Sequence, residues 1–263
     1  MSSHNKLAFS KPTSDDAERH VLFTTFRASG YQGLQLKYGQ YSEYLDQPAR
    51  FSDQWGAEAG LTPAPAVNPA SAIASGLITG GSLDDDGIEA LRRVFRFAQA
   101  AGSERIIFCH AQPRQGLTSA DIKGFARILS ELGKEAQQDY GVTLSLHHHY
   151  NQPVMYRQDF ATFFDALDDQ AVRLTVDTAH LVKSGIEDIA GILREYRQVI
   201  DNIHMKDIED GAFKVLGQGT IDFTPVFAAL HEIGYEGWLC ADEESGSDLH
   251  TAMETCAEFL TTR

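Results

Sequence analysis

The sequence predicts an α/β fold, a single (β/α)8 TIM barrel, and three observations support that class. Short apolar, β-branched runs alternate with longer amphipathic stretches along most of the chain, which is the pattern of a parallel sheet covered by helices. Successive runs lie about 30 residues apart, the length of one βα unit. Eight such units account for the 263 residues, since barrels of this class typically have about 250. We therefore expect one domain that spans residues 1–263.

Eight strands are expected because each run is short, apolar and rich in β-branched residues. They are Leu7–Ser10, Gly33–Tyr38, Ala72–Leu77, Arg105–His110, Val142–His149, Val172–Asp177, Val199–Lys206 and Trp238–Asp242. A doubly wound open sheet is the alternative. It is disfavoured because no Gly-x-Gly-x-x-Gly follows the first strand and no Gly-x-x-x-x-Gly-Lys-Ser/Thr loop is present.

Helices are expected between the strands, where apolar residues recur at helical spacing. The first, Asp15–Ser29, has Ser14 as its expected N-cap. The others are Phe51–Ala59, Asp84–Ala101, Ser119–Tyr140, Asp159–Leu167, Ile186–Tyr196 and Phe223–Ile233. The aromatic-rich segment Tyr38–Trp55 follows the second strand on the catalytic side. Three roles are open for this segment: it packs onto the barrel, it closes over the ring of a bound small molecule, or it joins two copies of the chain. A homo-oligomer therefore stays an alternative.

Composition limits the functional class. Thirty-seven acidic against 22 basic residues give a formal charge of −15, which repels phosphate backbones and argues against nucleic-acid binding. No apolar run reaches the length of about 18 residues that a membrane helix needs, and Met1–Lys11 shows no secretory signal. Three widely spaced cysteines, Cys109, Cys240 and Cys256, form neither a disulfide framework nor a Cys-x-x-Cys zinc site. We expect a soluble cytoplasmic protein.

Polar side chains gather at the ends of the last four predicted strands. Because side chains alternate between the two faces of a strand, the apolar Leu144 and Leu146 take the helix side and leave His147 on the barrel axis. The same alternation turns one polar residue inward near the end of each following strand. With His147, these residues are Asp177, His204 and Asp242. They converge at the carboxyl end of the barrel, where barrel enzymes have their active sites.

Such a set of imidazoles and carboxylates suits a divalent first-row metal ion, so Mn²⁺, Zn²⁺, Co²⁺ or Fe²⁺ is the predicted cofactor. Mg²⁺ and Ca²⁺ prefer oxygen ligands alone, and two imidazoles disfavour them. For each residue the alternative is a hydrogen-bonded structural role. His148 lies on the opposite face of the strand, and a one-residue shift of the strand would exchange it with His147.

Other polar residues near these strand ends are candidates for catalysis or substrate binding. Lys206 turns inward beside His204 and is expected to contact a substrate oxygen. Glu244 lies beyond Asp242 on the same side, and His180 begins the loop after the sixth strand. The expected substrate-binding residues are Lys37, His110 and His149. A solvated rim lysine and a loop-anchoring histidine are the alternatives for Lys206 and His180.

Four ordered segments resemble one family, the xylose-isomerase-like barrels of the sugar phosphate isomerase/epimerase group. They are Val172–His180, Ile203–Asp207 with its His-Met-Lys-Asp, Leu216–Phe223 with its Leu-Gly-Gln-Gly, and Gly234–Asp242. The resemblance implies a divalent metal held at the positions of His147, Asp177, His204 and Asp242. Two positions depart from the family pattern, since His147 and Asp242 stand where the family has glutamate. The triple histidine at His147 is similar to the inosose dehydratase branch.

The resemblance implies a metal-dependent sugar isomerase or epimerase that removes a proton beside the polarised carbonyl of a small keto-sugar or polyol. Asp242 or Glu244 would be the base, with His180 and Lys206 on substrate oxygens. Loss of water, as in an inosose-type dehydratase, is the alternative outcome, because the two departures weaken a two-base mechanism. Two further hypotheses are a non-catalytic sugar-binding barrel and phosphodiester cleavage, which the negative charge disfavours.

Overall fold

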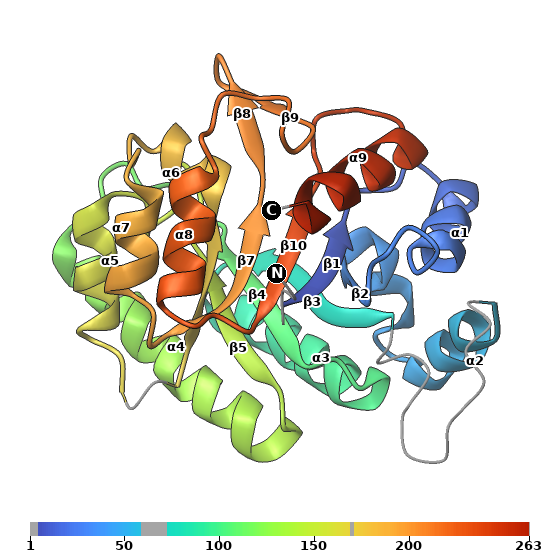
Figure 1. The fold of residues 1–263 in the computed structure, drawn as a ribbon. Helices are drawn as coiled ribbons and strands as arrows, with labels where there is room; N and C mark the ends of the chain where they lie inside the picture. The colour runs from blue at the N-terminus through green and yellow to red at the C-terminus, as the bar shows by residue number, and fades with distance from the viewer. Residues whose placement is uncertain (1–4, 59–72, 169–170, 263) are drawn as a thin grey trace.

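Eight parallel strands close into a barrel in the computed structural model (Figure 1), which describes residues 5–58, 73–168 and 171–262. Around the barrel the strands follow the order β1-β10-β7-β6-β5-β4-β3-β2. In chain order they are β1 (Lys6–Ser10), β2 (Gly33–Leu36), β3 (Ala74–Gly81), β4 (Arg105–His110), β5 (Thr143–His147), β6 (Arg173–Asp177), β7 (Ile200–Met205) and β10 (Trp238–Asp242). The predicted fold class is confirmed.

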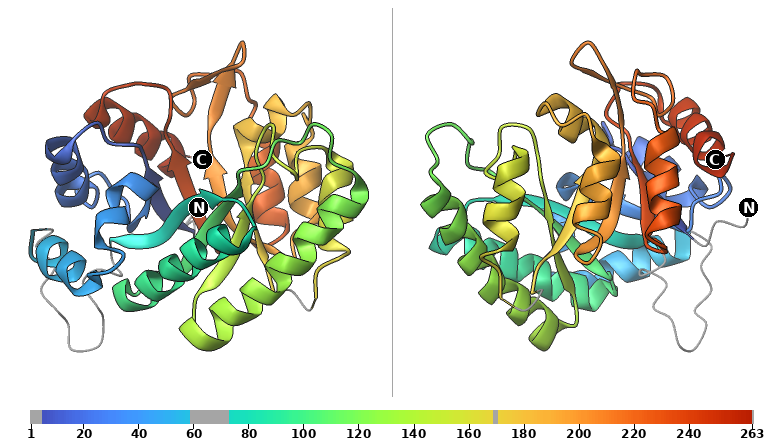
Figure 2. Two further views of the ribbon diagram at one scale, coloured as in Figure 1. Left: turned by 180° about the vertical axis from the view of Figure 1, so that it is seen from behind. Right: turned by 60° about the vertical axis from the view of Figure 1, so that its left-hand side comes forward.

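Helices form the outer layer, as the three views in Figures 1 and 2 show. They are α1 (Asp16–Thr25), α2 (Pro48–Glu58), α3 (Asp85–Ala101), α4 (Ser119–Tyr140), α5 (Arg157–Phe164), α6 (Thr178–Lys183), α7 (Ile189–Glu195), α8 (Thr224–Glu232) and α9 (Leu249–Thr261). In the described part of the chain, no helix combines the length and the apolar character that crossing a membrane requires.

Several predicted boundaries change. Asp15, not Ser14, caps α1, because its carboxylate accepts the Glu18 N–H, while the Ser14 hydroxyl donates to the Glu18 side chain. The second strand ends at Leu36 and is followed by a short 3₁₀ helix at Tyr38–Gln40, and β5 ends at His147. The expected starting residue of the third strand, Ala72, and the expected end of the second helix, Ala59, lie outside the described residues.

Two elements at the carboxyl end of the barrel were not predicted. Helix α6 begins directly after β6, at the point where a loop was expected to start at His180. A two-stranded hairpin, β8 (Asp207–Glu209) and β9 (Ala212–Lys214), follows β7 and projects above the barrel in Figure 1. Both are too short for a periodic sequence pattern to reveal them. They cover the region where the candidate residues converge.

The core fills the layer between barrel and helices. On β5, Leu144 and Leu146 pack outward as predicted. In the aromatic segment, Tyr41, Tyr44 and Phe51 are almost fully buried. This burial confirms the interpretation that the segment packs onto the barrel. The cysteines at 109, 240 and 256 are free thiols, as expected.

Gly133 lies where α4 packs closely against the segment that precedes β6. A Cβ at Gly133 would collide with the backbone carbonyl of Ala171, whereas a Cβ at Gly124 of the same helix would meet nothing within 4 Å. We expect Gly133→Ala to lower the free energy of unfolding by about 1–3 kcal/mol through overpacking. Gly124→Ala should raise it by about 0.5–1 kcal/mol through helix propensity. Urea denaturation measures both, and equal effects of the two substitutions would contradict this packing.

Candidate active site

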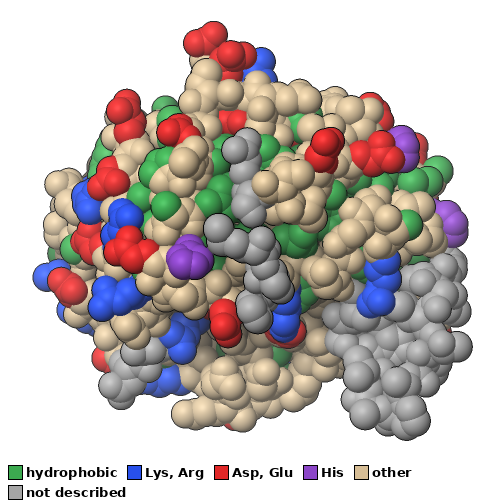
Figure 3. All heavy atoms as spheres, in the orientation of Figure 1, with side chains coloured by type: hydrophobic (Ala, Val, Ile, Leu, Met, Phe, Trp, Pro, Cys, Tyr) green, Lys and Arg blue, Asp and Glu red, His purple; other side chains and the backbone are tan. Residues whose placement is uncertain are grey.

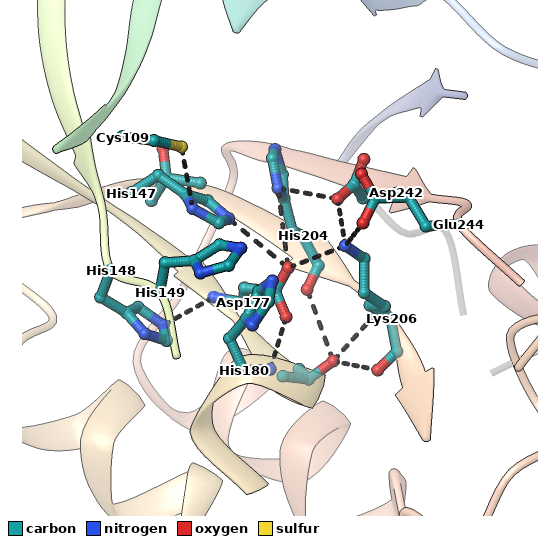
Figure 4. A network of polar contacts seen from close by, with 12 residues as sticks. Cys109, His147, His148, His149, Asp177, His180, His204, Lys206, Asp242 and Glu244 are labelled. Atoms are coloured by element: carbon teal, nitrogen blue, oxygen red, sulfur yellow. Dashed lines mark hydrogen bonds and ion pairs between the residues drawn. The ribbon is translucent and has the colours of Figure 1, made fainter. Parts of the chain in front are cut away.

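Three buried side chains bring their donor atoms together at the ends of β5, β6 and β7. His147, Asp177 and His204 are at most 4% exposed, and each offers one ligand atom within 4.8 Å of the other two. His147 Nε2 lies 3.5 Å from Asp177 Oδ2, and His204 Nδ1 lies 3.9 Å from the same oxygen. Figure 4 shows the two rings and the carboxylate pointing toward one another. We call this group the His–Asp–His cluster.

The donor atoms of the His–Asp–His cluster fit a divalent cation. His147 Nε2, Asp177 Oδ2 and His204 Nδ1 are all buried and have no hydrogen-bond partner. A buried polar atom without a partner costs about 1–3 kcal/mol, and here three such atoms face one point. Two imidazole nitrogens and one carboxylate oxygen are the donor set of Zn²⁺ and related first-row ions.

Neighbouring groups hold each of the three side chains in place. The His180 N–H donates to Asp177 Oδ1 (2.8 Å), and the Asp177 N–H donates to His148 Nε2 (2.9 Å). His147 Nδ1 lies 3.4 Å from Cys109 Sγ. His148 itself faces outward against Phe160 of α5, at 5.0 Å between ring centroids. His147 rather than His148 therefore points into the site, as the strand alternation predicts.

Two lysines and two carboxylates lie beside the His–Asp–His cluster. Lys206 Nζ is 2.6 Å from Asp242 Oδ2 and 2.8 Å from Glu244 Oε2. Lys37 Nζ, which comes from the end of β2, is 2.7 Å from Asp242 Oδ1 and 2.8 Å from Glu244 Oε1. Each lysine thus bridges both acids, and we call this group the lysine–carboxylate cluster. It joins three of the predicted catalytic residues to Lys37.

Asp242 connects the two clusters. Its Oδ2 lies 3.5 Å from His204 Nδ1, close enough to adjoin a metal site, but both its oxygens are held by lysines. Its place as a fourth metal ligand stays a prediction.

Charge pairing governs protonation at the lysine–carboxylate cluster. Burial raises the pKa of Asp242, but Lys206 and Lys37 outweigh it and hold that pKa well below its usual range. Burial lowers the pKa of Lys206, and Asp242, Asp177 and Glu244 outweigh it, so the pKa is raised overall. The four groups therefore carry two positive and two negative charges at neutral pH.

Charge also favours a cation at the His–Asp–His cluster. Burial lowers the pKa of His147, but the Cys109 sulfur and Asp177 raise it to about 10. Burial lowers the pKa of His204 to about 3. Lys206 Nζ, 3.7 Å from Asp177 Oδ2, also places positive charge beside this carboxylate.

Two histidines lie on the other side of the His–Asp–His cluster. The rings of His149 and His180 are 3.7 Å apart between centroids. Burial lowers the pKa of His149 to about 4 and lowers that of His180 further, so both are neutral near pH 7. In Figure 4 these rings lie across Asp177 from Asp242 and Glu244. The predicted residues His149 and His180 are thus brought into the site.

His110 is the candidate that does not join either cluster. Its ring packs against Phe125 of α4, at 4.4 Å between centroids, and it shares with His147 only a cavity of about 10 Å³. Cys109, one residue earlier, is the side chain of β4 that contacts His147. His110 therefore faces the helix layer, and its contact with substrate stays a prediction.

Sequence reasoning missed Gln35, Cys109 and Phe213. Gln35 Oε1 lies 2.8 Å from His204 Nε2 and can only accept a hydrogen bond from it. Its position two residues before Lys37 on one predicted strand could have indicated it. Phe213 of the hairpin lies under Lys206 Nζ, 4.5 Å from the ring centroid, and beside His180. No sequence signal indicates Phe213, because the hairpin was not predicted.

Asp207, the last residue of the His-Met-Lys-Asp segment, holds the loop that follows β7 and does not face the site. Its carboxylate accepts backbone N–H groups of Ile208, Gly217, Gly219 and Ile221 at 2.9–3.2 Å. A Cβ at Gly219 would collide with that carboxylate. This arrangement explains why a glycine-rich turn accompanies the segment.

Comparison with known proteins places the chain in one family. The family model for the xylose isomerase-like TIM barrel matches residues 23–263, and the chain belongs to this family. Inosose dehydratase of Clostridium tetani (strain Massachusetts / E88) is 36% identical over 146 residues, which cover 48% of this chain and 48% of that protein. The chain thus spans about half the length of the curated relatives it matches.

Two solved structures share the fold over nearly the whole chain. The structure of L-ribulose 3-epimerase has a TM-score of 0.75 at 18% identity and covers 98% of this chain and 94% of that chain. The IolI protein with a bound zinc atom has a TM-score of 0.73 at 18% identity, covering 98% and 97%. At these identities the likeness concerns the fold.

The buried ring of His110 makes stability depend on pH. Burial lowers the pKa of His110 to about 4, below the value of about 6.5 expected in the unfolded chain. The unfolded state therefore binds more protons between these values, and the free energy of unfolding falls as pH drops through that window. We expect wild type to lose about 2 kcal/mol more than His110→Gln between pH 7.5 and pH 5.

Urea denaturation at the two pH values measures this difference. His231→Gln is the matched control, because His231 is exposed on α8 and its removal should leave the pH dependence unchanged. Equal pH dependence of wild type and His110→Gln would show that the His110 ring is accessible to protons in the folded state.

Proposed function

We propose that this protein is a divalent-metal-dependent enzyme that removes the proton beside the carbonyl of a small keto-sugar or keto-polyol. The observation that carries the proposal is the His–Asp–His cluster, with three buried donor atoms that lack partners and face one point. His147, Asp177 and His204 would hold the ion, for which the nitrogen-rich set favours Zn²⁺, Mn²⁺, Co²⁺ or Fe²⁺ over Mg²⁺. Such an ion, when bound, polarises a carbonyl and so acidifies the adjacent C–H group.

The lysine–carboxylate cluster supplies the base. Asp242 lies closest to the His–Asp–His cluster, 3.5 Å from His204, and Glu244 lies farther out with its side chain 30% exposed. One of these two carboxylates would take the proton from carbon. Lys206 and Lys37 orient both acids, and Lys206, 3.7 Å from Asp177 Oδ2, is also placed to contact a substrate oxygen on which negative charge develops.

The arrangement of acids favours loss of water as the outcome. Epimerisation returns a proton to the opposite face of the carbon and so needs a second acid–base group of similar strength there. On the side opposite Asp242 and Glu244, this site has the imidazoles of His149 and His180. In a dehydration, the carboxylate takes the proton from carbon, and the electron pair of that C–H bond goes on to expel the neighbouring hydroxyl. The resulting carboxylic acid returns its proton to this hydroxyl, which leaves as water, so the carboxylate is restored. His149 and His180 would contact the oxygens of the substrate.

The similarity to proteins named inosose dehydratase supports this outcome. Isomerisation or epimerisation, the first expectation from sequence, begins with the same proton abstraction and is the second candidate. Its support is the family to which the chain belongs.

Proton NMR in D₂O with a panel of keto-inositols and ketoses tests the proposal. We expect the protein loaded with Zn²⁺, Mn²⁺ or Co²⁺ to convert a keto-inositol into a product that has lost water. Deuterium in the substrate or a new stereoisomer would instead indicate epimerisation. His147→Ala should lower the rate at least about 100-fold because a metal ligand is lost, and His231→Ala should not change it. Turnover that survives both chelation and His147→Ala would contradict the proposal.

A further inference from the structure

A layer of polar side chains crosses the barrel interior directly beneath the His–Asp–His cluster. It consists of Gln35 from β2, Ser145 from β5, Thr175 from β6 and Asn202 from β7, each at most 1% exposed. Branched apolar residues usually fill this part of such a barrel. Buried polar groups are costly unless every one is paired, so the hydrogen bonds of this layer decide what it does.

The bonds form a continuous chain that starts at an ion pair. Arg105 Nε donates to Asp201 Oδ2 at 3.0 Å. Ser145 Oγ donates to Asp201 Oδ1 at 2.7 Å and lies 2.7 Å from Thr175 Oγ1. Asn202 Nδ2 lies 3.4 Å from Thr175 Oγ1.

The series of hydrogen bonds ends at His204, one of the proposed metal ligands. Gln35 and Asn202 exchange two bonds, Gln35 Nε2 to Asn202 Oδ1 at 2.6 Å and Asn202 Nδ2 to Gln35 Oε1 at 3.1 Å. Gln35 Oε1 also lies 2.8 Å from His204 Nε2.

Counting the available protons decides which group donates and which accepts in each of these hydrogen bonds. The carboxylate of Asp201, paired with Arg105, accepts only, so the Ser145 proton points to it. Ser145 Oγ must then accept from the hydroxyl of Thr175. With its own proton used, Thr175 Oγ1 can only accept from Asn202, which fixes the NH₂ group of Asn202 on that side.

The orientation of the Asn202 amide in turn fixes the orientation of the Gln35 amide that faces His204. Because Gln35 and Asn202 exchange two bonds, their amides can reverse only together, and Thr175 holds Asn202. Gln35 therefore presents its carbonyl oxygen to His204, and that oxygen accepts the proton on Nε2. The neutral ring then has its lone pair on Nδ1, the atom that faces Asp177 and lacks a partner.

Strand pairing in the barrel is irregular at two residues that belong to this series of hydrogen bonds, Gln35 and Thr175. The β2–β3 register shifts between Leu34 and Gln35, and the β6–β7 register shifts between Leu174 and Thr175. Such irregularities re-aim side chains. Gly76 of β3 also leaves room for Gln35, since a Cβ there would lie 3.3 Å from Gln35 Cγ.

We propose that this chain of hydrogen bonds, from Asp201 through Ser145, Thr175, Asn202 and Gln35, fixes the tautomer of His204 so that Nδ1 is free to bind a metal ion. The proposal rests on the proposed metal-dependent function. Gln35, Asn202, Thr175 and Ser145 are then positioning residues. The opposite tautomer would direct an N–H group from Nδ1 at the His–Asp–His cluster and leave no lone pair for a ligand bond.

The tautomer can be measured in the metal-free protein by long-range ¹H–¹⁵N NMR of ¹⁵N-histidine-labelled samples. In wild type we expect His204 to carry its proton on Nε2. Ser145→Ala, four hydrogen-bonded links away from the His204 ring, should release Thr175 and give a mixture of tautomers. Ser130→Ala is the matched control, because Ser130 is a fully buried serine in α4 that bonds to Ala126 and Asp168.

Metal affinity gives an independent readout. Substitutions of groups that orient metal-binding histidines typically cost 10–100-fold in affinity, and we expect Zn²⁺ binding to weaken about 10-fold in Ser145→Ala and more in Gln35→Leu. Gln35→Glu keeps an acceptor facing His204 and should keep the Nε2–H tautomer. Circular dichroism confirms that each variant is folded.

A wild-type His204 protonated on Nδ1, or a tautomer unchanged in Ser145→Ala and Gln35→Leu, would overturn the proposal. Failure of the proposed function appears differently. In that case wild type would show the Nε2–H tautomer yet bind no divalent metal ion.

Discussion

The site depends on three buried donor atoms at the ends of adjacent strands that the chain itself leaves unpaired. His147, Asp177 and His204 are held by bonds on their other atoms, while the atoms that face one another have no hydrogen-bond partner. Leaving such atoms without a hydrogen bond costs free energy. A cation bound by all three would remove that cost, and its binding would therefore stabilise the folded state.

The surroundings of these atoms balance charge locally in a strongly acidic chain. Lys37 and Lys206 neutralise Asp242 and Glu244 next to the His–Asp–His cluster, so the base stays ionised without repelling an electron-rich substrate. On the face shown in Figure 3, basic side chains are interspersed with acidic ones and form no continuous basic surface among the described residues. The positive charges of Lys37 and Lys206 lie within the site itself.

The two-residue period of a strand predicts most residues of the His–Asp–His cluster. Alternation alone selects His147 over His148 and brings in Asp177 and His204, because each lies at or near the end of a strand with apolar neighbours. Alternation does not select His110, because its neighbour Cys109 takes the inward side of β4. It also misses Gln35, whose side chain is aimed by a shift in strand register, and Phe213, which lies on a hairpin too short to show a pattern. Period and composition carry no information about such irregularities.

The central claim is that one divalent ion binds between His147, Asp177 and His204. Diffraction from crystals grown with Zn²⁺ or Co²⁺, recorded at the absorption edge of the metal, tests it most directly. The account predicts one anomalous peak bonded to His147 Nε2, Asp177 Oδ2 and His204 Nδ1, at about 2.0–2.2 Å from each. A protein that shows no peak there, or binds the ion only at surface histidines such as His231, would contradict it.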